Sequence, residues 1–182
     1  MSHFLRHVPL RVFVTIIDAA AKSKKLNKEK IAVNILRQMQ SVALRPVKIS
    51  YNSVLNACAL SNGDEGNKTE ILQIALAMLR EARETCGACY VTCNTCLRII
   101  ASLQPDKGER WKLAKDIFGQ YCSDKQVTPL ILAQLKYTVA PARSSLLLRE
   151  VIDEQTGKIR EDVTLNAKRA KMTPLKTFRY KI

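Results

Sequence analysis

The stretch Lys48-Ile49-Ser50-Tyr51-Asn52-Ser53-Val54-Leu55-Asn56-Ala57-Cys58 decides how the fold is interpreted, because a second stretch repeats its pattern. That second stretch is Tyr90-Val91-Thr92-Cys93-Asn94-Thr95-Cys96-Leu97-Arg98-Ile99-Ile100. Each contains a β-branched residue, a hydroxyl residue, a core residue, Asn, another hydroxyl residue and two apolar residues. Looser versions include Val14 and Val127, so the pattern recurs at intervals of about 35 to 42 residues, which is typical of helical repeat proteins.

The rest of the chain shows helical periodicity. Apolar residues recur at three- and four-residue spacing, which predicts amphipathic helices beginning near residues 12, 31, 51, 70, 92, 109, 129 and 144. Pro46 ends the second helix, Thr69 is expected to be the N-cap of the fourth, and Gly87 is expected to stop it. Pro129 opens the seventh helix, and Pro141 separates the seventh from the eighth.

Short loops join these helices into four antiparallel pairs. The predicted fold class is therefore all-α, a short α-solenoid of about three to four stacked helix-turn-helix hairpins. The expected organisation is an N-terminal segment (1–9), four helical repeats (about 10–47, 48–89, 90–124 and 125–156) and a basic C-terminal tail (157–182).

The repeated stretches are similar to the first helix of the pentatricopeptide repeat, whose pattern is Val-Thr-Tyr-Asn-Thr-Leu-Ile. Residues 49–55 match it closely, and residues 91–97 match it with Cys in the place of Tyr. The family's second helix carries a small residue, a large apolar residue and Met before a Pro, an order that this chain follows at Ala32, Leu36, Met39 and Pro46. The chain resembles this family over residues 10–140, although tetratricopeptide and HEAT hairpins share the same apolar spacing.

The resemblance implies a modular reader of single-stranded RNA that recognises about one base per repeat. It assigns Asn52 and Asn94 to hydrogen bonding with base edges. It also assigns Ile49 and Val91, three positions earlier in each repeat, to packing against the bases.

The family's second reading position falls on Cys89 for the Asn52 repeat and on Asp124 for the Asn94 repeat. In the two outer repeats, Val14 and Pro129 occupy the Asn position, and neither can read a base edge. At most two repeats are thus competent, and roughly 1–3 kcal/mol per base gives little selectivity. A non-enzymatic helical scaffold for protein–protein contacts in a ribonucleoprotein is therefore the alternative, in which both Asn side chains bond to helix ends or to a neighbouring repeat.

The charge of the chain favours a polyanionic partner. There are 30 Lys and Arg residues against 16 Asp and Glu residues, so the net charge is +14. Basic residues gather in the first sixty and the last twenty positions, where a polyanion would be held first. Single-stranded RNA is the expected partner, with protein partners in a ribonucleoprotein as a second possibility. No membrane contact is expected, because no apolar run reaches about 18 residues.

The resemblance also implies a location in a mitochondrion or plastid, and a role in RNA processing, stability or translation. Residues 1–17 are amphipathic and contain no acidic residue, as in a transit peptide. We expect this stretch to be part of the first helix instead, with a missing or short presequence.

The six cysteines include the string Cys86, Cys89, Cys93 and Cys96. No secretory signal precedes them, so reduced thiols are expected rather than disulfides. The two pairs of cysteines lie closer together than in most structural zinc sites, and their spacing differs from that of ferredoxins, so neither a metal nor another cofactor is expected. With only two histidines and no nucleophile–base or paired-carboxylate motif, the chain is not expected to be an enzyme.

Overall fold

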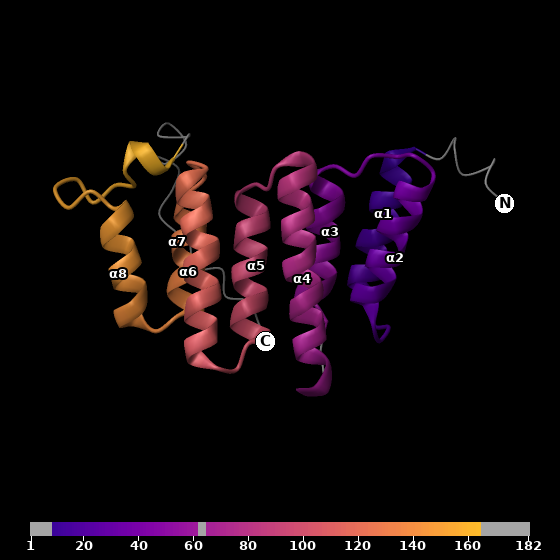
Figure 1. Ribbon diagram of the computed structural model, residues 1–182, viewed down its shortest axis with the longest axis horizontal. Helices are drawn as coiled ribbons and strands as arrows, with labels where there is room; N and C mark the ends of the chain where they lie inside the picture. The colour runs from indigo at the N-terminus through magenta and orange to yellow at the C-terminus, as the bar shows by residue number, and fades with distance from the viewer. Residues whose placement is uncertain (1–8, 62–64, 165–182) are drawn as a thin grey trace.

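The computed structural model of the protein describes residues 9–61 and 65–164. This part of the chain contains eight α-helices, one short 3-10 helix and no β-structure beyond two isolated bridges (Figure 1). The all-helical prediction is therefore confirmed. The helices are α1 (Leu10–Lys22), α2 (Lys28–Ser41), α3 (Lys48–Ala59), α4 (Glu65–Cys86), α5 (Tyr90–Leu103), α6 (Lys107–Ser123), α7 (Pro129–Thr138) and α8 (Pro141–Val151), followed by η2 (Glu161–Val163).

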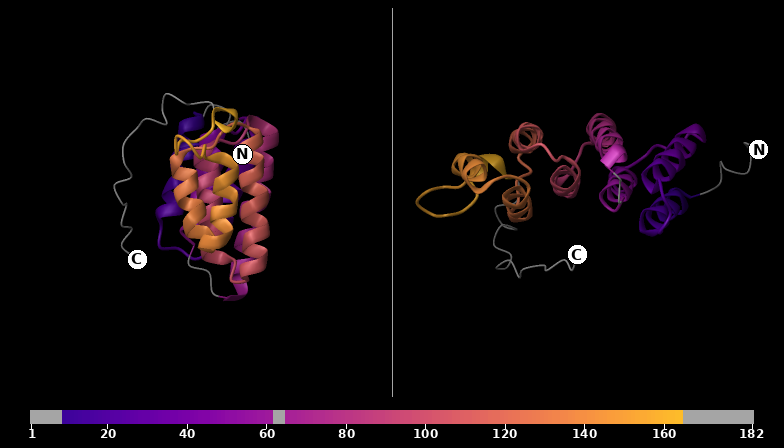
Figure 2. Two further views of the ribbon diagram at one scale, coloured as in Figure 1. Left: turned by 90° about the vertical axis from the view of Figure 1, so that its left-hand side faces the viewer. Right: turned by 90° about the horizontal axis from the view of Figure 1, so that it is seen from below.

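The helices form two rows along the long axis of the molecule. Helices α1, α3, α5 and α7 each pack on the next member of the series, and we call them the odd row. The even row consists of α2, α4, α6 and α8, each of which packs on the odd helix before it. Seen from below, the chain zigzags between the two rows (Figure 2). Equivalent positions of successive odd helices therefore lie side by side, which matters for the site described below.

Local sequence explains most of the helix ends. Gly87 follows α4 with a φ of +72°, a left-handed conformation in which a Cβ would be strained, and so it stops the helix as predicted. Asp106 is the N-cap of α6, and its Oδ1 accepts a hydrogen bond of 2.7 Å from the Glu109 backbone N–H. Pro129 is the first residue of α7, where its missing N–H costs nothing.

Three predicted boundaries are wrong. Helix α2 ends at Ser41, so Pro46 lies in the following loop and does not end the helix. Helix α4 already begins at Glu65, so Thr69 lies inside the helix and is not its N-cap. Pro141 is the first residue of α8 rather than part of a separating loop. A proline fits the first turn of a helix as well as it fits a loop, so the sequence pattern alone did not distinguish these roles.

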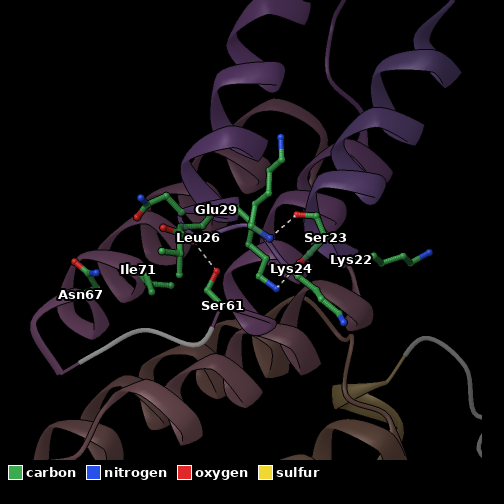
Figure 3. Close-up of a pocket in the computed structure, with 11 residues that line it drawn as sticks. Lys22, Ser23, Lys24, Leu26, Glu29, Ser61, Asn67 and Ile71 are labelled. Atoms are coloured by element: carbon green, nitrogen blue, oxygen red, sulfur yellow. Dashed lines mark hydrogen bonds between the residues drawn. The ribbon is translucent and has the colours of Figure 1, made fainter.

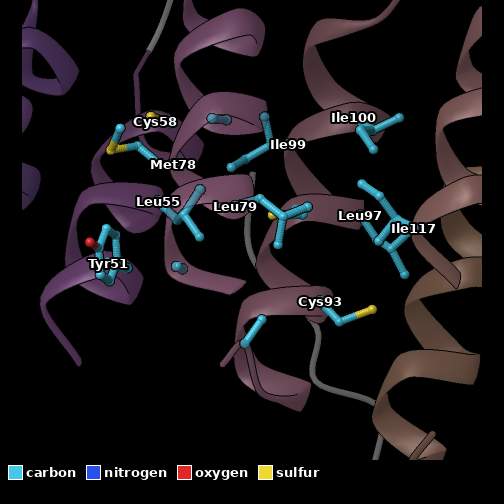
Figure 4. Close-up of a cluster of buried hydrophobic side chains, with 14 of the residues drawn as sticks. Tyr51, Leu55, Cys58, Met78, Leu79, Cys93, Leu97, Ile99, Ile100 and Ile117 are labelled. Atoms are coloured by element: carbon cyan, nitrogen blue, oxygen red, sulfur yellow. The ribbon is translucent and has the colours of Figure 1, made fainter. Parts of the chain in front are cut away.

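The core lies between the two rows and consists of large apolar side chains from both. Leu55, Leu97 and Ile100 from the odd row are fully buried, and Leu79 and Ile117 from the even row are almost so (Figure 4). Burial of each such side chain is worth about 1.5–3 kcal/mol. Cys58, Cys93 and Cys96 also lie in this core, where a thiol packs as a small apolar group.

Polar contacts join α2 to α4 on the even side. The Arg37 guanidinium makes two hydrogen bonds of 2.7 Å to the two carboxylate oxygens of Glu81. The Tyr51 hydroxyl, on a fully buried side chain of α3, donates to Glu81 Oε1 at 3.1 Å. The hydrogen bonds that Glu81 accepts from Arg37, Gln40 and Tyr51 hold the pKa of its carboxyl group below the ordinary value, although partial burial raises it. These contacts fix the first two helix pairs against each other.

The segment after α8 returns to the helices. Ile152 and Ile159 form an antiparallel bridge, and Gln126 forms another with Thr164. The backbone N–H of Val127 donates to the carbonyl of Val163 at 3.1 Å, and Val163 is buried. The first residues of the expected tail, 157–164, are therefore packed on the helical part. The rest of that tail lies outside the described residues.

Candidate nucleic-acid interface

The N-terminal ends of three successive odd helices carry an exposed apolar residue at the same position. The second residue is Ile49 in α3, Val91 in α5 and Leu130 in α7, with exposed fractions of 62%, 38% and 45%. We call these three residues the apolar row. The sequence predicted Ile49 and Val91 but missed Leu130, because Pro129 was given the Asn position. The Thr128-Pro129 pair, an N-cap followed by a first-turn proline, is the signal that sets the correct register.

The fifth residue of α3 is Asn52, and its amide bonds to the start of α5. The Thr92 hydroxyl donates to Asn52 Oδ1 at 2.8 Å, and Asn52 Nδ2 donates to the Cys89 sulfur at 3.7 Å. The structure thus brings together Asn52 and Cys89, the pair that the family resemblance implies. An Asn amide has two donor hydrogens and two acceptor lone pairs. One of each remains for a further partner after these contacts.

The fifth residue of α5 is Asn94, and its environment differs. Its Oδ1 is buried and has no hydrogen-bond partner in the described part of the protein. Thr92, which serves Asn52, is the third residue of α5, and the third residue of α7 is the apolar Ile131. The next helix therefore offers no hydroxyl at the equivalent position. A buried acceptor without a partner costs about 1–3 kcal/mol, so Asn94 has unused hydrogen-bonding capacity.

Asp124 does not take the place that the resemblance gave it. It lies at the end of α6, where its Oδ2 is 2.8 Å from an Arg83 guanidinium nitrogen. Arg83 also lies over the ring of Tyr121, 5.5 Å from the centroid. The position equivalent to Cys89 belongs instead to Thr128, the N-cap of α7, whose hydroxyl oxygen accepts from the Ile131 N–H at 3.4 Å.

Pro129 does not hold the Asn position either. It is the first residue of α7, and the fifth is Ala133. In α1 the fifth residue is Val14, as expected. The conclusion that the outer two repeats lack an amide at this position is therefore unchanged, but the residue responsible in α7 is Ala133.

Cationic groups flank the same end of α3. Lys48 is the first residue of α3, and its aliphatic chain reaches Gly87 in the loop between α4 and α5. Arg45 donates from Nη2 to the Thr85 carbonyl at 2.8 Å, near the end of α4. Two positive charges therefore lie near Cys86 at the end of α4, where a phosphate following the apolar row would be attracted.

A second basic region lies at the opposite end of the first helix pair. The loop from α1 to α2 lines a cavity of about 400 Å³ with Lys22, Lys24, Lys25 and Lys28 (Figure 3). The buried Glu29 at its base accepts a hydrogen bond of 2.6 Å from the Ser61 hydroxyl. This pair ties the loop after α3 to the start of α2.

The thiols of the cysteine string have different environments. At Cys89, burial raises the pKa, but hydrogen bonds from the Thr92 side chain and backbone, Asn52 and the Val91 backbone outweigh it, so the pKa is below the ordinary value. Burial raises the pKa of Cys93 and Cys96. In residues 9–61 and 65–164, no three His, Cys, Asp or Glu side chains are grouped so that they could hold a metal ion. All six cysteines are free thiols.

Comparison with known proteins identifies no relative. No protein-family model matches the chain, and no curated protein or solved structure is significantly similar to it. Within the described residues, every helix is too short or too polar to cross a lipid bilayer. The functional interpretation therefore depends on the residues at the odd-row ends.

Proposed function

We propose that the protein is a non-enzymatic, pentatricopeptide-like α-solenoid that binds single-stranded RNA across the N-terminal ends of its odd row. The observation that carries this proposal is the apolar row, with Asn52 and Asn94 three positions further along two of its helices. An exposed apolar side chain next to a polar amide, repeated at the spacing of a helix pair, suits a base that is contacted by both.

The expected contacts divide by chemistry. Ile49, Val91 and Leu130 offer apolar contacts to the faces of successive bases, which is possible for any base. Asn94, which is partly exposed although its amide oxygen is buried, can offer its amide N–H groups to a base edge, and Asn52 its remaining donor and acceptor. The phosphates contact cationic side chains, and the net charge of +14 attracts them over a longer range.

A short reader of this kind suits a role as a module in a larger process. Two or three bases give little selectivity, so the chain would act on transcripts together with other proteins. The resemblance in residues 10–140 supports a role in RNA processing, stability or translation in a mitochondrion or plastid. The basic composition is consistent with such a role.

The deciding experiment measures the affinity of the purified chain for a random pool of single-stranded RNA and for duplex DNA across a salt series. We expect a preference for single-stranded RNA that persists at about 150 mM salt. Ile49→Ser should weaken RNA binding, whereas Leu146→Ser should not. Leu146 is a matched control, because its side chain is similarly exposed but lies on α8 in the even row. Equal losses in both variants, or binding that disappears with salt, would refute the proposal.

One observation favours a scaffold as the second candidate. The Asn52 amide is bonded to Thr92 and Cys89, and Arg98 of α5 donates to Asn56 of α3 at 3.1 Å. These contacts show that amides on the odd row can serve the packing of helices on each other. In that case the protein would hold other subunits of a ribonucleoprotein, and neither Ile49→Ser nor Asn94→Ala would change its affinity for RNA.

A further inference from the structure

In each odd helix after α1, one face is buried toward the odd helix before it. The third and seventh residues lie on this face, since residues four apart share one side of a helix. They are Ser50 and Val54 in α3, Thr92 and Cys96 in α5, and Ile131 and Leu135 in α7, and all six are buried. The hydrogen bond from Thr92 to Asn52 shows directly that this face meets the preceding odd helix.

Helix α1 has the same face but no helix before it in the described part of the chain. Its third and seventh residues are Val12 and Ile16, which are 41% and 47% exposed. Two β-branched apolar residues therefore stand in water at positions that are covered in the other three odd helices. Together with Ala19 one turn further, also exposed, they form what we call the α1 edge.

At the opposite end of the odd row, no helix of the described residues follows α7, which leaves a face of the complementary kind. In α3, the fifth and ninth residues, Asn52 and Asn56, bond forward to α5. In α7, the fifth and ninth residues are Ala133, which is half-buried, and Tyr137, which is 74% exposed. We call these two residues the α7 edge.

The contacts inside the molecule indicate how the two edges would meet. The fifth residue of one odd helix contacts the third of the next, as Asn52 contacts Thr92, which would place Ala133 against Val12. The ninth residue of one odd helix contacts the ninth residue of the next, as Asn56 of α3 contacts Arg98 of α5. The same pairing would place the Tyr137 hydroxyl of α7 near the Asp18 carboxylate of α1. The first pairing is apolar on both sides, and the second joins a donor to an acceptor.

We propose that the α1 edge is the docking surface for the α7 edge of a second copy of this chain. The interface continues the packing of the odd row from one copy into the next. Because the two edges differ, the contact is heterologous and does not close, so copies add head to tail. The net charge of +14 opposes this association, and screening by salt therefore strengthens it, whereas salt weakens RNA binding.

Sedimentation velocity under reducing conditions tests this proposal over about a hundredfold range of protein concentration. We expect species larger than the monomer at high concentration, and more of them at high salt. The Val12→Asp/Ile16→Asp double variant and the Tyr137→Asp variant should each remain monomeric. Leu146→Asp is the control, because its site on α8 is as exposed as these but lies on neither edge, and it should still associate. Circular dichroism on heating checks that each variant is folded.

Mixing the two monomeric variants separates this contact from other modes of association. Each retains one intact edge, so the mixture should form a 1:1 dimer and nothing larger. An unmodified protein that is monomeric at every concentration would overturn the proposal. Association that survives Tyr137→Asp would also overturn it, since it would indicate symmetric pairing of two α1 edges, and so would a mixture that does not dimerise.

Discussion

The packing of α3 on α5 and the packing of α5 on α7 can be compared, because α3 and α5 carry an asparagine at the same helical position. Asn52 and Asn94 are both the fifth residue of an odd helix. The Asn52 amide bonds to Thr92 of the next helix and to Cys89, the N-cap of that helix, whereas the oxygen of Asn94 is buried without a partner in the described residues. The difference arises on the following helix, which carries Thr92 at its third position in one case and Ile131 in the other.

This comparison shows that a repeat residue cannot be assigned a role from its own position alone. A reader and a packing residue can be the same amide, distinguished only by what the neighbouring repeat presents to it. In this protein the Asn52 amide uses hydrogen bonds to pack α3 on α5, whereas the Asn94 oxygen makes no hydrogen bond to α7. Substitutions at these positions should therefore separate packing from RNA binding.

Replacing Thr92 by Val should have the largest effect on the stability of the packing between α3 and α5. The hydroxyl donates to Asn52 and accepts from the Cys89 backbone N–H at 3.1 Å, and both bonds are lost without a change of shape. We expect the free energy of unfolding to fall by about 2 kcal/mol, measured by urea denaturation. At the same position in α7, Ile131→Val removes only a methylene and should cost about 0.5–1.5 kcal/mol. A smaller loss for Thr92→Val than for Ile131→Val would contradict this account.

Replacing Asn94 by Ala should separate binding from stability. Because its buried oxygen has no hydrogen bond to lose and its removal relieves an unpaired acceptor, we expect the free energy of unfolding to stay the same or to rise by up to about 1 kcal/mol. If Asn94 contacts a base edge, the affinity for preferred RNA sequences should fall about tenfold, which corresponds to about 1.4 kcal/mol. Fluorescence anisotropy with selected and random RNA measures this. An equal loss on both RNAs would show that Asn94 does not read bases.

Replacing Asn52 by Ala should do the opposite and mainly affect stability. The Thr92 hydroxyl loses its acceptor and Cys89 its donor, so we expect the free energy of unfolding to fall by about 1 kcal/mol. Asn34→Ala is the control, since Asn34 is exposed on α2 in the even row. Thermal unfolding of the two variants side by side gives the answer, and matching melting temperatures would mean that the Asn52 bonds contribute nothing to stability.

The smallest expected effect concerns the Cys89 thiol. Its pKa is below the ordinary value, so at a given pH near neutrality a larger fraction is thiolate, which is the nucleophile. Alkylation by iodoacetamide should therefore be faster at Cys89 than at Cys86, whose pKa is raised by burial. Thr92→Val should raise the pKa of Cys89 and slow its alkylation severalfold, as measured by mass spectrometry of the labelled peptides. Similar rates at both cysteines would show that these hydrogen bonds do not activate the thiol.

Most of the fold was predictable because it depends on local chemistry. Apolar spacing predicted all eight helices, and Gly87 and Pro129 marked two of their ends. The boundary at Thr69 failed, because the residues before it, Glu65 to Lys68, continue the helix without an apolar signal. Helix ends decided by polar residues alone are weakly specified by sequence.

The site was less predictable, because it depends on pairs that are distant in sequence. Ile49 and Val91 follow from the repeat pattern, and the structure exposes both. The ion pair of Asp124 with Arg83 connects the ends of two even-row helices, and no local pattern announces it. The missing partner of Asn94 is likewise a property of how α5 and α7 align, since one loop length shifts which residue becomes third in the helix.

The contact pattern of the two rows also bears on how the chain reaches this structure. Among the described α-helices, substantial contacts join only helices that are neighbours or next neighbours in the chain. Native contacts are therefore short in sequence separation, and chains of this kind fold in microseconds to milliseconds. Each pair of helices relies on its nearest neighbours, as in a one-dimensional array. We expect hydrogen exchange to be slowest in α3 and α5, which have neighbours on both sides, and the terminal pairs to open first.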